Sequence, residues 1–152
     1  MVIQRWQTLM LLISAVMMAL FSFCSLGQIQ GADITVNFTA LSMTVEGTGK
    51  TYMPTWYILV VSLLSTLLPL IGIFRYKALK EQRKICMLSI VLTLAAMASA
   101  WIASSYAGVE GARGMAWSSI VIAPFVAIIA LIVAIRCIGS DMRKLSGYDR
   151  LR

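Results

Sequence analysis

The sequence predicts an all-α membrane protein, a bundle of four transmembrane helices with a small β-structured outer loop between helices one and two. Three observations indicate this fold. Four stretches contain no Lys, Arg, Asp or Glu, namely residues 6–32, 51–74, 85–109 and 114–135. Hydrophobic residues make up 60% of the chain, whereas they make up about half of a usual soluble domain. Between the first two stretches, apolar and polar residues alternate, which is typical of strands.

Each charge-free stretch is long enough for one span. A helix rises about 1.5 Å per residue and needs roughly 20 apolar residues to cross the hydrocarbon core. Aromatic residues near the ends refine the bounds, because Trp and Tyr favour the membrane surface. The predicted spans are residues 6–27, 56–75, 85–107 and 115–138. A single integral membrane domain, residues 1–152, then has an outer loop at 28–55, a cytoplasmic loop at 76–84 and a cytoplasmic tail at 139–152.

The positions of the charges predict the orientation. The chain has a net charge of +7, and its basic residues concentrate between residues 75 and 84 and in the tail from Arg136. Basic residues that flank spans stay on the cytoplasmic side, so both termini are expected there. Because these charges lie beside spans, they favour a topological role and do not indicate a nucleic-acid partner.

Small residues in the spans predict close helix packing. In lipid, helices associate through van der Waals contact, and small side chains let their backbones approach. Spans three and four carry such residues at steps of three and four. The predicted packing positions are Ala95, Ser99, Ala103, Ala123, Ala127, Ala130 and Ala134.

Two prolines interrupt the predicted spans. Pro69 and Pro124 each remove a helical hydrogen bond and are expected to kink spans two and four. Ser65 lies one turn before Pro69, where a carbonyl loses its usual donor. These kinks either shape the bundle or serve as hinges of a transporter, and the first interpretation is favoured.

The outer loop is expected to form a β-structured cap. Residues 34–40 and 41–46 alternate apolar with polar side chains, and many of them are β-branched. Residues 47–49, Gly-Thr-Gly, are typical of a turn, so residues 51–53 are expected to pair back on the preceding strand. The tip at 108–114 is expected to pack beneath this cap.

The chemistry of the chain argues against an enzyme. There is no histidine, and no acidic residue lies inside a predicted span, where a proton-coupled carrier would need one. Cys24, Cys86 and Cys137 are interpreted as packing residues, with lipidation of Cys86 or Cys137 as the alternative. We therefore expect no catalytic residues, no cofactor and no metal site.

The charged edges remain as candidate functional surfaces. Clustered basic residues bind anionic headgroups or an acidic patch on a partner. The candidate cytoplasmic contacts to a partner or to lipid are Arg5, Arg75, Lys77, Lys80, Arg83, Lys84, Arg143, Lys144, Arg150 and Arg152. Expected partners are the lipid bilayer and other membrane protein subunits or a second copy of the chain.

Both ends of the chain resemble those of a known family. The opening run at 1–9 with Leu-Leu-Ile at 11–13, and the closing segment from 134–138 to 149–152, are similar to those of an uncharacterised bacterial family, domain of unknown function 4293. The resemblance implies four spans and an inner membrane of Bacteroidetes-type bacteria, and it implies no activity. Both ends lie on the expected cytoplasmic side, where they are expected to form one contact surface.

Two functions follow as hypotheses. The first is a non-enzymatic inner-membrane protein that acts as a small accessory or scaffold subunit of a membrane protein complex. The alternative is a small-solute transporter or channel with proline hinges. The predicted topology is also similar in shape to that of claudin-like proteins, although no cysteine lies between residues 30 and 54 to form the loop disulfide typical there.

Overall fold

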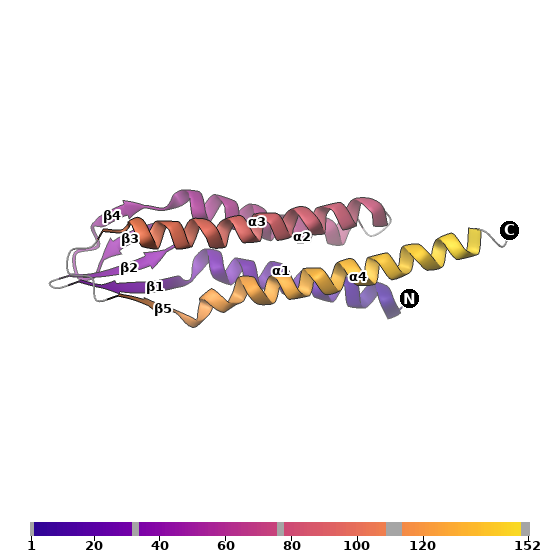
Figure 1. The fold of residues 1–152 in the computed structure, drawn as a ribbon, viewed down its shortest axis with the longest axis horizontal. Helices are drawn as coiled ribbons and strands as arrows, with labels where there is room; N and C mark the ends of the chain where they lie inside the picture. The colour runs from indigo at the N-terminus through magenta and orange to yellow at the C-terminus, as the bar shows by residue number, and fades with distance from the viewer. Residues whose placement is uncertain (1, 32–33, 76–77, 109–113, 150–152) are drawn as a thin grey trace.

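Four long helices form an elongated bundle that carries a β-sheet at one end (Figure 1). The computed structural model describes residues 2–31, 34–75, 78–108 and 114–149. Each helix contacts two neighbours: α1 packs against α2 and α4, and α3 packs against the same two helices. The helices are α1 (Val2–Phe23), α2 (Trp56–Phe74), α3 (Leu79–Tyr106) and α4 (Ala123–Asp149), with a short 3₁₀ turn, η1 (Ser119–Ile122), before α4.

All four helices are long and apolar enough to cross a membrane, which confirms four candidate spans. The beginning of α1 and the end of α4 lie opposite the sheet (Figure 1). We call the two ends of the bundle the sheet end and the basic end. The basic end comprises the start of α1, the α2–α3 connection and α4 from Ile135 onwards.

The sheet has five antiparallel strands in the order β4-β3-β2-β1-β5. A β-structured segment between the first two helices is therefore confirmed. It is built from β1 (Ser25–Gln30), β2 (Thr35–Thr39), β3 (Ser42–Val45) and β4 (Thr51–Pro54), and β5 (Met115–Trp117) is added from the connection between α3 and α4.

Two predicted span ends are wrong because strands occupy them. The first span was expected to reach residue 27, but α1 ends at Phe23 and β1 follows. The fourth was expected to begin at residue 115, where the chain instead forms β5. Both strands lie inside charge-free stretches, and the absence of charge does not distinguish a strand from a helix.

A glycine allows β1 and β5 to approach. Gly27 pairs with Trp117, and a Cβ atom placed on Gly27 would lie 2.6 Å from the carbonyl oxygen of Ala116. Such a separation is shorter than non-bonded contact allows, so any larger residue would push β5 away. From Gly27 onwards the side chains of β1 alternate, with Ile29 buried and Gln28 and Gln30 exposed. Leu26 is buried as well, although it lies three residues before Ile29, because the strand register shifts between Ser25 and Gly27.

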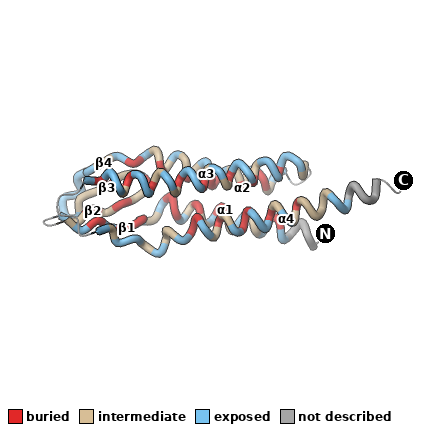
Figure 2. Tube along the Cα trace, in the orientation of Figure 1, coloured by how far each residue is buried: buried red, intermediate tan, exposed pale blue. Residues whose placement is uncertain are grey.

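The main hydrophobic core lies where the sheet meets the helices, and a second cluster lies at the basic end. Figure 2 shows the buried residues along the inner faces of the helices. In the main core, Phe38 and Met43 of the sheet are fully buried together with Phe21 of α1. The second cluster comprises Leu11, Cys86, Leu131, Ala134 and Ile138.

The predicted packing residues of α4 are all buried, whereas of those of α3 only Ala103 is buried. Buried predicted positions are Ala103, Ala123, Ala127, Ala130 and Ala134. Ser99 is half-buried and Ala95 is exposed, so Ala95 does not pack within this bundle. The neighbouring row of α3, Thr93, Ala96 and Ala100, is the one that faces the interior.

The two prolines have different roles. Pro69 lies inside α2, and the carbonyl of Ser65 that it deprives of a donor accepts a hydrogen bond from Ser89 Oγ of α3 at 3.2 Å. Pro124 lies in the first turn of α4, directly after η1. The candidate span runs from Ser119 to Lys144, so Pro124 lies inside it, where η1 passes into α4. Proline fits the first turn of an α-helix with little loss, and the kink expected there stays a prediction.

The predicted tail at 139–152 is helical as far as Asp149, because α4 continues without a break. In Figure 1 its last turns extend beyond the other three helices. The predicted tip at 108–114 lies largely outside the described residues.

Candidate interaction surface at the basic end

The predicted basic contacts whose side chains the structure describes gather at one end of the bundle, at the end of α2 and on α3 and α4. Arg75 directly follows α2, the next group lies in the first turns of α3, and the last group lies on α4. Their side chains are exposed to solvent: Arg75, Lys80, Arg83, Lys84, Arg143 and Lys144. Lys77, Arg150, Arg152 and the side chain of Arg5 lie outside the described residues.

The described acidic side chains at this end already have partners. Glu81 forms an exposed ion pair with Lys84 at 3.4 Å, a type of pair that contributes about 1 kcal/mol or less. Asp141 of α4 accepts a hydrogen bond from Nε2 of Gln7, a buried side chain of α1. This contact holds the first helix to the last and directs the carboxylate of Asp141 toward α1.

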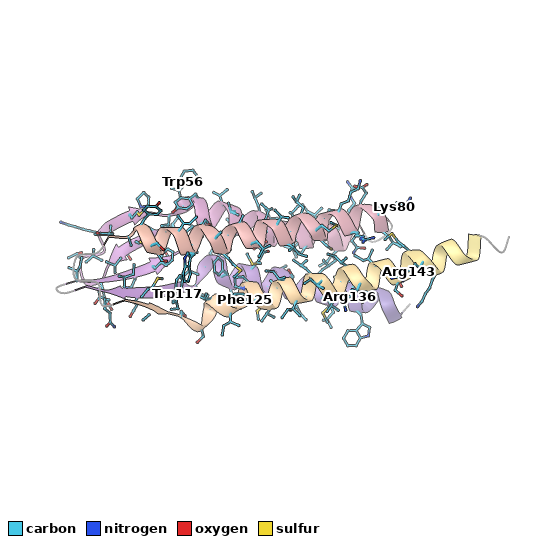
Figure 3. All side chains as sticks on the ribbon, in the orientation of Figure 1. Trp56, Lys80, Trp117, Phe125, Arg136 and Arg143 are labelled. Carbon is cyan, nitrogen blue, oxygen red and sulfur yellow. The ribbon has the colours of Figure 1, made fainter. Side chains whose placement is uncertain are left out.

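Between α3 and α4, the basic end contains an open pocket of about 600 Å³. The charged residues that line it, among those whose side chains the structure describes, are arginines. Its lining comprises Arg83 of α3 and Ile135, Arg136, Gly139, Met142 and Arg143 of α4. Figure 3 labels Arg136 and Arg143 on α4 and Lys80 near the start of α3.

Sequence reasoning assigned Arg136 to topology alone and did not place it in a site. A signal was available, because Arg136, Gly139 and Arg143 are spaced by three and four residues. Residues at these steps share one face of a helix. Gly139 lies between the two arginines, and a Cβ atom placed on it would meet no atom within 4 Å. The face is therefore open to a ligand at that point.

A guanidinium group presents a planar fork of N–H donors that matches phosphate and carboxylate groups. The pocket can therefore hold an anion by charge and by directed hydrogen bonds. Within the described ranges, no group of three or more His, Cys, Asp or Glu residues is arranged to hold a metal ion. The three cysteines are free thiols.

A second, apolar groove lies near the sheet end. Its volume is about 280 Å³, and α3, α4 and the segment from β5 to η1 form most of its walls. Trp101 of α3 and Trp117 of β5 stack there with ring centroids 6.0 Å apart and planes 5° from parallel. Phe125 of α4, labelled in Figure 3, also lines the groove. The stacked pair attaches β5 to the helices.

The fold and its two ends define a class: a four-helix protein with candidate membrane spans, a five-stranded sheet at one end and a basic surface at the other. The family profile named domain of unknown function (DUF4293) matches residues 3–151. The chain belongs to this family, as its two ends suggested. No curated protein and no solved structure is found to match it.

Proposed function

We propose that the chain is a multi-pass integral protein of a bacterial inner membrane, with the basic end in the cytoplasm and the sheet end outside. Large apolar side chains that point away from the bundle support insertion, for example Leu64, Leu67 and Ile71 of α2, each about half exposed. Monomeric soluble proteins rarely expose apolar patches that continue along several helices. The basic residues at one end favour the cytoplasmic side for that end.

Within the membrane, we infer a non-enzymatic accessory or scaffold subunit that binds other membrane proteins. The observation that supports this role most is the last part of α4, which extends past the rest of the bundle (Figure 1). It presents the exposed side chains of Arg143 and Lys144 to one side of the membrane. A projecting basic helix is suited to a partner with an acidic surface, because complementary charge guides association.

Four hydroxyl groups inside the bundle, those of Ser22, Ser62, Ser65 and Thr93, support packing more than transport. Ser65 Oγ lies 2.6 Å from Thr93 Oγ1, and Ser22 Oγ of α1 donates to Ser62 Oγ of α2 at 2.9 Å. These groups bond to one another between helices instead of facing a solute. The bond from Ser89 to the carbonyl freed by Pro69 also opposes a hinge at that proline.

The test is affinity capture of the full chain from native membranes in a mild detergent, followed by mass spectrometry. We expect one membrane protein to be recovered in constant proportion to the chain. Replacing Arg143 and Lys144 by Ala should lower its recovery severalfold, whereas Lys50→Ala at the sheet end should not. Recovery of the chain alone would contradict the scaffold role, and equal recovery with every variant would contradict the role of the α4 end.

A further inference from the structure

We propose that the arginine pocket between α3 and α4 binds the phosphate group of one anionic phospholipid. The inference rests on the membrane insertion proposed above and assigns a ligand to the basic end. Its basis is the placement of three guanidinium groups from two helices around one cavity of about 600 Å³.

The charge of the pocket favours an anion. Arg83 approaches from α3, and Arg136 and Arg143 approach from α4. Neither of the described carboxylates at this end is among the described lining residues: Glu81 pairs with Lys84, and Asp141 bonds to Gln7. An anion in the pocket therefore meets positive charge from two sides.

The geometry favours phosphate. Arginine binds phosphate oxygens through parallel N–H donors, which gives direction as well as charge. Gly139 lies between the two arginines of α4 and leaves open space where a side chain would stand. A tetrahedral group can thus approach the backbone of α4 beside the side chain of Arg136.

The surroundings favour a lipid over a free phosphate ion. Ile135 and Met142 form apolar walls of the pocket. About one turn closer to the sheet end, Ile132 and Val133 are exposed on the same helix. An acyl chain can follow this apolar surface of a candidate span while its headgroup remains among the arginines.

The experiment measures lipid retention by the full chain, purified in a mild non-ionic detergent. Native mass spectrometry records binding of phosphatidylglycerol and, separately, of phosphatidylcholine. Wild type should retain one phosphatidylglycerol in preference to phosphatidylcholine. Arg136→Gln should weaken retention about fivefold, as expected for a basic residue near a headgroup. Gly139→Leu should weaken it at least as much, because it fills the pocket without removing charge.

The matched control is Lys80→Gln, which removes one positive charge from the same end but not from the pocket. Its retention of phosphatidylglycerol should remain within twofold of wild type. An equal loss in Arg136→Gln and Lys80→Gln, or full retention by Gly139→Leu, would overturn the proposal. Displacement of the lipid by millimolar inorganic phosphate would also overturn it and would assign the pocket to a soluble anion.

The same preparations separate this inference from the proposed function. A chain that enters detergent micelles as a folded monomer but shows no lipid preference would refute the pocket and leave membrane insertion intact. A chain that stays folded in buffer without detergent would refute membrane insertion itself.

Discussion

The hydrogen bond from Ser89 to the carbonyl of Ser65 is expected to stabilise the bundle because Pro69 makes it necessary. Proline cannot donate, so the carbonyl four residues earlier has no helical partner. In lipid, neighbouring Ser and Thr side chains satisfy such groups. Ser89 Oγ lies 3.2 Å from this carbonyl, and Ser65 Oγ reciprocates toward the carbonyl of Ser89 at 3.3 Å.

The cost of Ser89→Ala follows from these contacts. A hydrogen bond between membrane helices contributes about 0.6 kcal/mol on average and about 1.7 at most. Leaving a buried acceptor without a partner costs about 1–3 kcal/mol. We therefore expect Ser89→Ala to lower the free energy of unfolding by about 1–2 kcal/mol. The exposed Ser105 bonds only within α3, so Ser105→Ala should change it by less than about 0.5 kcal/mol.

A double-mutant cycle isolates the cause. Pro69→Ala restores a backbone donor for the carbonyl of Ser65, so Ser89→Ala should then cost only about 0.6 kcal/mol. Reversible unfolding by sodium dodecyl sulfate in mixed micelles, followed by circular dichroism, gives all four free energies. An equal cost of Ser89→Ala with and without Pro69 would show that the missing donor of Pro69 is not what makes the Ser89 hydrogen bond necessary.

Three further predictions concern other contacts. Gly27→Ala should destabilise the protein by about 1–3 kcal/mol in the same assay, because its methyl group meets the backbone of β5. Gly139→Ala, which faces open space inside helix α4, should instead stabilise the protein by up to about 1 kcal/mol, because alanine favours a helix interior over glycine. Asp141→Ala should lower the free energy of unfolding by about 1–3 kcal/mol, because it leaves the buried Gln7 amide without its acceptor. The double variant with Gln7→Leu should recover most of that loss, and no recovery would contradict the pairing of Gln7 with Asp141. Trp117→Ala should abolish the exciton signal that two stacked indoles give in circular dichroism, and a persistent signal would show that the rings do not stack in solution.

The four helices could be predicted from the sequence because a membrane span leaves a strong local signal. Apolar runs of about 20 residues without a charge are typical of helices that cross a bilayer. The ends of the helices were harder to predict, because a charge-free run indicates a segment of low polarity but does not indicate whether it is a helix or a strand. Gln28 and Gln30 alternate with apolar neighbours and did indicate a strand, but the run around them obscured it.

The strand β5 had no local signal, since three residues are too few for a periodicity. Its place depends on Gly27, more than eighty residues earlier, which allows its backbone to approach β1. Tertiary pairing of this kind is not encoded in a sequence window.

The basic surface was predictable from charge, but the pocket was not. The spacing of seven residues between Arg136 and Arg143 places both on one face of α4, and this spacing can be read from the sequence. Arg83 lies beside them only because of the way α3 packs against α4. That register follows from the interior contacts of the whole bundle, which leave Ala95 outside.

The proposed topology, a spanning bundle with its sheet outside, is tested most directly by cysteine labelling from one side of the membrane. In a variant without Cys24, Cys86 and Cys137, Thr48→Cys marks the exposed turn between β3 and β4, and Lys80→Cys marks the basic end. A membrane-impermeant maleimide applied to intact spheroplasts should label the Thr48→Cys protein at once and the Lys80→Cys protein only after permeabilisation. Labelling of both from outside, or of the basic end alone, would contradict a spanning bundle with its sheet outside.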